Sequence, residues 1–416
     1  MIPTDRSSLP RAAGALASLA EQQPEINKLL QLTVPEQHAR GYIHTLREIC
    51  QQPRTWLGTC DLMLRSGEVI ERSLSGAKSL VLTGSGSSDY AGSCARQELQ
   101  NHLGVSVEAV AGGAILTNGL RALPPARPGL VVSLSRSGQS PESLAAIAKL
   151  LEAEPGLRHL VITCNAEGTL AAKYSAHPHV SVIVLDPSTN DRSLVMTSSF
   201  TNLVLAARFL GYRCDPGEYR RLCETLAGIV DRLLATSVGV IAEMARRKFS
   251  RVIFLSDSAR IGAGRECVLK MLEMTAGRIS PMHETFLGLR HGPMSFISPD
   301  TLVVAFLSSE PRRRAYEADL LREIDRKQLG LAKLVVGEKV PKEVLRDVDA
   351  IVECQGLSQA EDADACIVDV VAGQLLAFFR CMHEGLLPDS PSENGIISRV
   401  VGSFAIHDSS EGHRGA

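Results

Sequence analysis

The segment SLSRSGQSPES, residues 133–143, has the residue types needed to bind an anion. The apolar run GLVV precedes it and predicts a buried strand. Pro141 stands where a first helical residue belongs, and Ser140 stands where its N-cap belongs. The serines Ser135 and Ser137 therefore lie on a strand-to-helix turn that faces free N–H groups and a positive helix end. This arrangement predicts a site for a phosphate group.

A second turn of small residues, GSGSS at 84–88, follows the apolar run LVLT and leads into a helix from Asp89. Serine suits phosphate because its hydroxyl donates a hydrogen bond while its small size lets the backbone approach. Either turn alone is also explained as a polar loop that caps a helix. The two matching turns together favour the phosphate site.

Glu266, Lys270 and Glu273 are spaced four and then three residues apart, which places them on one face of a helix. A carboxylate on a rigid helix is suited to carrying a proton between neighbouring carbon atoms. A ladder of surface ion pairs explains the same spacing equally well. His291 lies further along in the constrained turn RHGP, and a histidine exchanges protons near neutral pH.

These residues must be positioned by an alternation of strands and helices. After about 75 helical residues, the strands SLVLT, GLVVSLS, HLVIT and VSVIVL alternate with helices, which predicts a parallel sheet covered on both faces. The order then repeats: VIFLSDSARIGAGR corresponds to LVLTGSGSSDYAGS, and VVAFLSSEPRRRA corresponds to VVSLSRSGQSPES. The second copy lacks the Ser-Arg-Ser-Gly turn, so only the first copy is expected to bind the anion.

Composition excludes several classes of protein. The formal net charge of −2 provides no field that would recruit nucleic acid or an anionic membrane, so neither is expected as a partner. No apolar run reaches the roughly 18–20 residues of a membrane span, and the first residues lack the pattern of a signal peptide. The ten cysteines contain no CxxC pair, which favours reduced thiols in a cytoplasmic protein over disulfides or a zinc site.

The two serine turns resemble the phosphate-sugar turns of the sugar isomerase (SIS) domain. ECVLKMLEMTAG followed by LGLRHGPMSF resembles the catalytic helix and histidine loop of the isomerase half of glucosamine-6-phosphate synthase, a tandem pair of SIS domains. FLGLRHGP and the tail ISRVVGS resemble the AgaS family, which is named for tagatose-6-phosphate ketose/aldose isomerase and acts as a galactosamine-6-phosphate deaminase/isomerase. The resemblance covers about residues 40–405.

The resemblance implies a role for each matching residue. Glu273 matches the family's base and Lys270 its lysine, while His291 matches the histidine that opens the sugar ring. The phosphate would be held by Ser88, Ser135, Ser137 and Ser140. Arg136 replaces a glutamine of the synthase, and either adds a charge-assisted bond or faces solvent.

The resemblance says less about the roles of residues in three further parts of the chain. The loop with Val195 and Thr197 would line the sugar site, although Thr197 is equally explained as a helix N-cap. Arg399 stands near the family's tail lysine and can bind or stabilise, but cannot carry a proton. The segment from Glu273 to His291 is two residues longer than in the synthase, which leaves the alignment of His283 open. His283 and His291 could be taken for two metal ligands, but no third ligand stands nearby, so no metal is expected.

We therefore expect two doubly wound, flavodoxin-like α/β SIS domains at residues 61–215 and 216–385, with a helical arm at 1–60 and a tail at 386–416. The expected reaction converts galactosamine 6-phosphate to tagatose 6-phosphate and ammonia without a cofactor. The alternatives are a plain aldose/ketose isomerase, a glucosamine-6-phosphate deaminase, and a SIS module that senses a sugar phosphate. The family's histidine loop serves a neighbouring subunit's site, so the resemblance also implies a homodimer or larger homo-oligomer.

Overall fold

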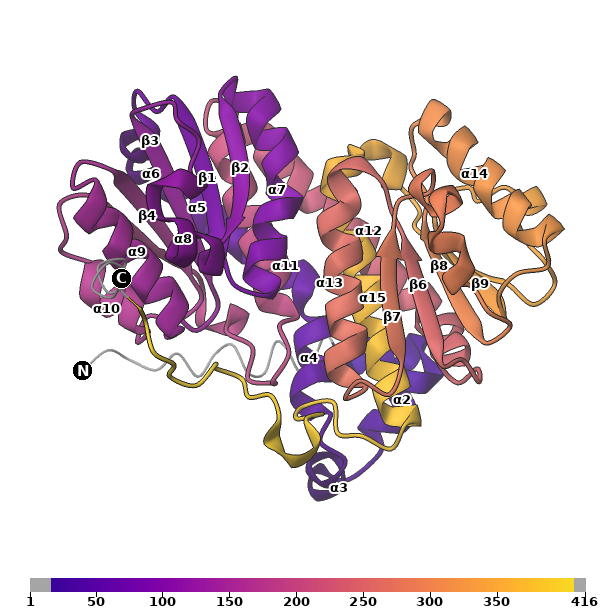
Figure 1. The fold of residues 1–416 in the computed structure, drawn as a ribbon. Helices are drawn as coiled ribbons and strands as arrows, with labels where there is room; N and C mark the ends of the chain where they lie inside the picture. Colours follow the sequence, from indigo (N-terminus) through magenta and orange to yellow (C-terminus); the bar gives the residue numbers. More distant parts are fainter. Residues whose placement is uncertain (1–15, 408–416) are drawn as a thin grey trace, which may run out of the picture.

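Two parallel sheets form the framework of the protein, and the computed structural model describes residues 16–407 of it (Figure 1). Each sheet has five strands. The first is ordered β2-β1-β3-β4-β5 and the second, in the same sense, β7-β6-β8-β9-β10. Both sheets thus repeat the order known from flavodoxin-like folds, which confirms the predicted pair of doubly wound domains and the internal repeat.

The strands of the first sheet are β1 Ser79–Gly84, β2 Ser106–Ala111, β3 Gly129–Ser135, β4 Arg158–Thr163 and β5 Val180–Val184. Its helices are α7 Ser87–Leu103, α8 Gly112–Asn118, α9 Pro141–Ala153, α10 Thr169–Tyr174 and α11 Ser198–Tyr212. The strands of the second sheet are β6 Arg251–Leu255, β7 Ser280–Glu284, β8 Thr301–Phe306, β9 Ala332–Gly337 and β10 Ala350–Glu353. Its helices are α13 Ile261–Met274, α14 Pro311–Arg326 and α15 Asp362–His383.

Helices also precede and connect the two sheets. The N-terminal ones are α2 Pro24–Leu30, α3 Val34–Ala39, α4 Ile43–Cys50, α5 Gln52–Arg65 and α6 Gly67–Leu74. The long helix α12, Pro216–Ala245, joins the sheets and packs against α5 and α15. Helix α5 crosses the expected limit of the arm at residue 60, and residues 1–15 and 408–416 lie outside the described chain. The domain limits stay predictions.

Strands in the middle of both sheets are buried on both faces, as expected for parallel sheets covered by helices. In β1, Leu80 and Leu82 belong to the large core formed with α7 and α11, whereas Val81 belongs to a smaller core on the opposite face. Side chains along β6 alternate between two cores in the same way: Phe254 belongs to the large core and Ile253 to a smaller core on the opposite face of the second sheet.

Four strands were not foreseen, β2, β7, β9 and β10. Of these, β2 and β7 lie next to β1 or β6 at an edge of their sheet. Their sequences, SVEAVA and SPMHE, are partly exposed along their length. An edge strand contacts fewer neighbours and therefore needs no continuous apolar run, which removes the signal used for the inner strands. Strand β7 contains His283 and so gives the structure of the segment whose alignment the sequence alone leaves open.

Helices α7 and α13, the first helix of each repeat, pack against each other between the two lobes of Figure 1. Gly262 permits this close approach, because a Cβ atom there would lie 2.7 Å from the Cys94 sulfur and 2.8 Å from the Cys94 backbone nitrogen. The contact brings the polar face of α13 next to the turn that precedes α7. The two repeats thereby contribute to a common site.

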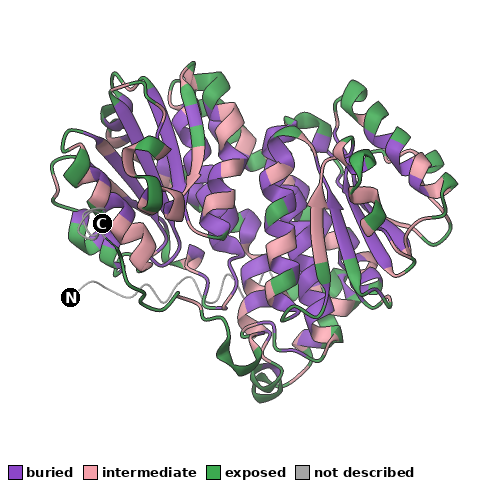
Figure 2. Cartoon of the chain, in the orientation of Figure 1, coloured by how far each residue is buried: buried purple, intermediate pink, exposed green. Residues whose placement is uncertain are grey.

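Two helices, α12 and α15, are long and apolar enough to cross a membrane by length and composition, which the sequence reading missed. In α15, 94% of the apolar segment is buried inside the fold, and in α12 the share is 56% (Figure 2). Core helices of this kind satisfy the same criteria as membrane spans. All ten cysteines lie in the described part of the chain and are free.

Candidate active site

A cavity of about 540 Å³ lies at the carboxyl ends of β1 and β3, where ligands bind in open α/β sheets. Five parts of the chain surround it: the two serine turns, the loop before α11, one face of α13 and the C-terminal tail. The predicted site residues that line it are Ser88, Ser135, Arg136, Ser137, Ser140, Glu273 and Arg399. The structure thus brings together most of the positions selected from the sequence.

The turn after β3 is stabilised by its own serines. The Gly138 N–H donates to the Ser135 hydroxyl oxygen at 3.0 Å, and the Gln139 N–H donates to that of Ser137 at 3.2 Å. Gly138 has a φ of +63°, a conformation that glycine adopts without strain. Both hydroxyls act as acceptors inside the turn, so their own hydrogens remain available to a ligand in the cavity.

Helix α9 directs free backbone N–H groups at the same cavity. Its hydrogen bonds begin with the Leu144 N–H donating to the Ser140 carbonyl at 3.2 Å. The N–H groups of Glu142 and Ser143 have no acceptor in the described chain, and both residues line the cavity. Ser140 is the N-cap, as predicted, but its side chain makes no capping bond. Unpaired N–H groups at the start of a helix favour an anion.

The turn before α7 supplies further hydroxyls. Ser88 donates only to the thioether of Met196, at 3.9 Å, and the buried hydroxyl of Ser85 has no partner in the described chain. Gly84 lets the helix start this close to β1, because a Cβ atom there would lie 2.6 Å from the Ser88 backbone carbon. Weakly paired hydroxyls around a cavity are what an anionic ligand would satisfy.

The corresponding turn of the second repeat is filled by the protein's own carboxylates. At the start of α14 the N–H groups of Arg312 and Arg313 donate to Glu310, at 2.9 and 2.8 Å. The Ser308 N–H donates to Glu317 at 2.8 Å, and its hydroxyl donates to Asp362 at 2.5 Å. Donors that are free in the first repeat are therefore occupied here, which gives a physical reason for placing the anion site in the first repeat alone.

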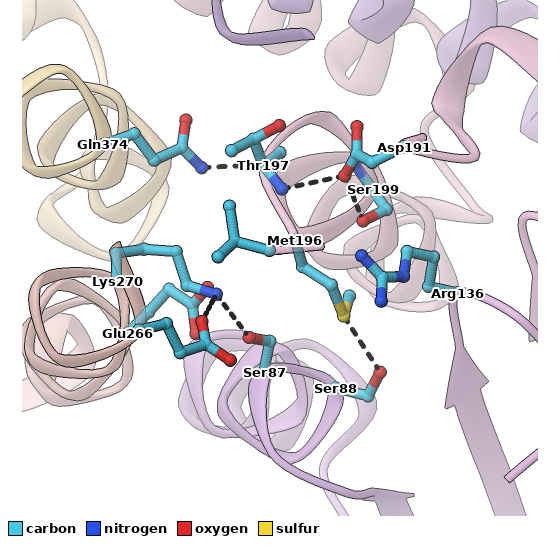
Figure 3. Close-up of polar contacts among 12 residues, drawn as sticks. Ser87, Ser88, Arg136, Asp191, Met196, Thr197, Ser199, Glu266, Lys270 and Gln374 are labelled. Carbon is cyan, nitrogen blue, oxygen red and sulfur yellow. Dashed lines mark hydrogen bonds and ion pairs between the residues drawn. The ribbon is translucent and has the colours of Figure 1, made fainter. Parts of the chain in front are cut away.

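Lys270 is fully buried and lies among three oxygen-bearing side chains (Figure 3). Its Nζ donates to Glu273 at 2.6 Å and to Ser87 of helix α7 at 3.1 Å, and lies 3.2 Å from a carboxylate oxygen of Glu266. Glu273 remains 22% exposed on its side chain and faces the cavity. The set is therefore not a ladder of surface ion pairs, the alternative that the spacing left open.

Burial determines the electrostatics of this cluster. Desolvation, together with repulsion from Glu273, raises the pKa of Glu266 to about 7, although Lys270 acts in the opposite direction. Desolvation works against the charged form of Lys270, but the two carboxylates outweigh it and raise the pKa of the ammonium group. Lys270 therefore stays positive, and it holds Glu273 in a fixed position with a charge-assisted hydrogen bond.

Arg136 neither faces solvent nor bonds to its own turn. Its guanidinium donates to the carbonyls of Ser193 and Leu194, at 3.3 and 2.9 Å, and to the Arg399 carbonyl at 2.6 Å. Only 7% of the residue is exposed. Of the two alternatives left open for Arg136, exposure to solvent is wrong, because the turn directs the side chain inward, where backbone carbonyls from two other segments converge.

Arg399, from the tail, binds the loop before α11. Its Nε donates to the Asp191 carbonyl at 2.8 Å, and its Nη2 donates to the Asn190 side chain at 2.6 Å. This agrees with the prediction from the sequence that Arg399 binds or stabilises and does not carry a proton. The tail that carries it runs from the second lobe across to the first in Figure 1.

Val195 and Thr197 are buried and do not line the cavity; their neighbours Leu194 and Met196 do. Thr197 precedes α11 as its N-cap, without a capping side-chain bond. Its N–H donates to the Asp191 carboxylate at 2.8 Å, so its backbone fixes the loop. The ligand side of this loop is therefore formed by Leu194 and Met196 and not by the predicted pair.

Two buried acids behind this loop were missed. Asp191 accepts hydrogen bonds from the N–H groups of Thr197 and Ser199, at 2.8 and 2.9 Å, and Glu48 accepts one from the Arg192 N–H at 2.5 Å. Burial raises the pKa of Asp191, and burial beside Asp191 raises that of Glu48 to about 8. No motif marks them, because Glu48 belongs to α4, far from the loop in sequence.

His291 does not reach the cavity of its own chain. It ends the short helix Gly288–His291 between β7 and β8, and it is exposed. His283 is half-buried in β7, where its ring lies 2.9 Å from the Ser256 hydroxyl, and desolvation lowers its pKa to about 4. Within residues 16–407, no three His, Cys, Asp or Glu side chains gather in a way that would hold a metal ion.

Comparison with known proteins identifies the family. A curated Streptomyces coelicolor protein, provisionally named D-galactosamine-6-phosphate deaminase AgaS, is 34% identical over 372 residues, which are 88% of this chain and 95% of that protein. The Escherichia coli protein named D-galactosamine-6-phosphate deaminase AgaS is 31% identical over 370 residues, 87% of this chain and 95% of its own. The chain belongs to the AgaS family. No family model matches the sequence.

Comparison with solved structures shows the same fold. A Clostridium novyi protein, provisionally named tagatose-6-phosphate ketose/aldose isomerase, superposes with a TM-score of 0.84 at 30% identity. The match covers 89% of this chain and 96% of that one. Tandem SIS architecture and the resemblance drawn from the serine turns and the RHGP loop are thereby confirmed.

Proposed function

We propose that this AgaS-family protein is an amino-sugar-phosphate deaminase/isomerase that converts galactosamine 6-phosphate and water to tagatose 6-phosphate and ammonia. The observation that carries the proposal is one cavity lined both by the donors of the serine turns and by a carboxylate held by a buried lysine. Relatives named for the deaminase and for the tagatose-6-phosphate isomerase support the choice of substrate.

The phosphate occupies the serine turns in this proposal. Hydroxyls of Ser88, Ser135 and Ser137 donate to its oxygens, together with the free N–H groups at the start of α9. Many weakly paired donors around one anion bind it without a metal ion. The phosphate then fixes the sugar so that C1 and C2 approach Glu273.

Glu273 carries the proton. In the open-chain sugar it removes the proton from C2 and returns it to C1, while the C2 amine loses one proton and the C1 oxygen gains one, so that C1 becomes a CH2OH group and the C2–N bond becomes a ketimine. Water then adds to C2, and ammonia leaves. Lys270 holds the carboxylate through the 2.6 Å bond, so the same group reaches both carbons.

Ring opening is assigned to His291 of a second subunit. The residue is exposed and absent from the lining of its own cavity, which supports a shared site in a homodimer or larger homo-oligomer. A histidine that moves a proton near neutral pH suits this step.

The decisive experiment is an ammonia-release assay with purified protein over galactosamine 6-phosphate, glucosamine 6-phosphate and the corresponding non-amino sugars. We expect kcat/KM for galactosamine 6-phosphate to exceed that for glucosamine 6-phosphate by about tenfold or more, because one misplaced hydroxyl leaves polar groups unpaired. Equal rates, or interconversion of the non-amino sugars alone, would contradict the assignment.

A further inference from the structure

Arg136 connects three segments that are far apart in the sequence. It belongs to the phosphate turn, yet its guanidinium donates to two carbonyls of the loop before α11 and to one carbonyl of the tail. The shortest of these bonds, at 2.6 Å, is to Arg399. Three of the five N–H groups of the guanidinium are therefore used by backbone carbonyls.

The tail is fastened a second time at the same place. The Arg399 side chain donates to the Asp191 carbonyl at 2.8 Å and to Asn190 at 2.6 Å. The stretch 396–402 on either side of it lines the cavity. Within this stretch, Ile396 is 84% exposed and Val401 is 60% exposed, so apolar burial does little to hold it. Its position depends on the two arginines.

A first anchor lies upstream, and between it and Arg399 the Arg278 guanidinium donates to Glu393 at 2.7 Å and the Ile397 N–H donates to the Ser392 hydroxyl at 3.0 Å. Asp389 accepts hydrogen bonds from the Thr45 N–H and hydroxyl, at 2.7 and 2.8 Å, and its own N–H donates to the Gly41 carbonyl at 2.6 Å. The chain then runs ten residues to Arg399. Loss of the bond from Arg136 would release the backbone of the tail at the Arg399 carbonyl, while the upstream anchor at Asp389 would stay intact.

The positive charges of Arg136 and Arg399 are not neutralised by direct ion pairs with the nearby carboxylates. Desolvation and the nearby Arg399 both lower the pKa of Arg136, whereas Asp191, Glu273 and Glu48 act in the opposite direction. Neither arginine forms an ion pair within residues 16–407, because Asp191 and Glu48 accept bonds from backbone N–H groups instead. A phosphate dianion in the adjacent cavity would reduce the repulsion between the two guanidinium groups and favour the fastened tail.

We propose that Arg136 is a positioning residue: it fastens residues 396–402 as a wall of the cavity and couples the fastening to phosphate binding, without being the group that holds the phosphate. Only the expected effect of Arg136 on turnover rests on the proposed function. Phosphate affinity and the exchange of tail amides do not require any substrate to react, so they test it separately.

The test compares wild type with Arg136→Met and Arg136→Lys by hydrogen exchange of the 396–402 amides, with and without inorganic phosphate. In the wild type, phosphate should slow this exchange. In Arg136→Met the exchange should be faster by about fivefold or more and insensitive to phosphate, while the Kd for inorganic phosphate rises by no more than the factor by which phosphate slows the exchange in the wild type, because the coupling is reciprocal. Arg136→Lys keeps the charge but cannot span three carbonyls, so it should show an intermediate exchange rate.

Arg158→Met is the matched control. That arginine also donates to backbone carbonyls, those of Arg72 and Ser75, but it begins β4 at the opposite end of the sheet. It should leave tail exchange and phosphate affinity unchanged. A loss of phosphate affinity of about tenfold or more in Arg136→Met, with tail exchange unchanged, would make Arg136 a phosphate ligand and overturn the proposal.

Turnover separates the two proposals. Should wild type release no ammonia from any hexosamine phosphate, the proposed function fails, while the exchange and affinity data still decide the role of Arg136. With turnover present, Arg136→Met should lower kcat/KM for the sugar phosphate by about tenfold or more. Unchanged kcat/KM together with unchanged tail exchange would also refute the positioning role.

Discussion

The ammonium group of Lys270, in the second repeat, donates a hydrogen bond to the hydroxyl of Ser87, in the first repeat, at 3.1 Å. The lysine is fully buried, and its other bond at 2.6 Å fixes Glu273. The position of the carboxylate therefore depends on the packing of α7 against α13 and not on α13 alone. A base positioned in this way can approach two neighbouring carbon atoms without rearrangement of the backbone.

Glu273→Gln should abolish proton transfer while preserving binding. The amide keeps the size of the side chain and a hydrogen-bond acceptor for Lys270, so the Kd for the sugar phosphate should change little. The rate constant kcat should fall by about 10²- to 10⁴-fold, the usual contribution of a general base. Deuterium at C2 of the sugar should slow the wild type if proton removal limits the rate. Near-normal turnover of the variant would place the base elsewhere, first at Glu266 or Glu284.

Ser137→Ala should weaken binding of the phosphate. Its hydroxyl oxygen accepts the Gln139 N–H at 3.2 Å, which leaves its hydrogen for the ligand. Loss of a hydrogen bond to a charged group costs about 1.5–3 kcal/mol, so KM for the 6-phosphate should rise by about 10-fold or more. Ser175→Ala, an exposed serine at the end of α10, is the control and should leave KM unchanged. Equal effects on the 6-phosphate and on the free sugar would refute the phosphate turn.

The phosphate turn was predictable because all of its signals are local. A strand, small polar residues, a proline and an amphipathic helix follow one another within SLSRSGQSPES, and the structure has them in that order. The destination of Arg136 was not predictable, because its partners at 193, 194 and 399 become neighbours only after the loop and the tail have folded onto the turn. The same limit applies to Glu48.

The edge strands mark a second limit of sequence reasoning. Periodicity detects strands that are buried on both faces, such as β3, but not β7, whose residues are mostly half-buried. The loop to His291 was consequently difficult to align. Its exposed position follows from where β7 ends, and a single chain contains no information about the surface that a second subunit would cover.

Glu266→Gln should change how stability depends on pH. Burial raises the pKa of Glu266 from 4.5 to about 7 in the folded protein. Its contribution to the free energy of unfolding is therefore complete below pH 4.5 and is lost as the pH rises through about 7. From about pH 6 to about pH 8, wild type should lose more stability than the variant, measured by urea unfolding. Parallel losses would show that the carboxyl group is already ionised at the lower pH.

Mixing two inactive variants should restore activity if subunits share the site. Glu273→Gln removes the base from one chain, and His291→Ala removes the ring-opening group from the other. In a mixed dimer, one of the two sites then combines an intact Glu273 with an intact His291. The purified mixed dimer should have about half of the wild-type activity per subunit, because one of its two sites is complete; an unfractionated mixture with random pairing would have about a quarter.

This experiment requires the variants to exchange subunits, so each is labelled with a different affinity tag and the mixed species is purified before assay. A tagged mixture of wild type with Glu273→Gln provides the control for the tags. The His291→Ala variant alone should recover part of its rate on substrate that is already open-chain, because ring opening is the step assigned to it. If the purified mixed species is no more active than its parents, His291 does not act across a subunit boundary. A shared site is equally contradicted if wild type sediments as an active monomer.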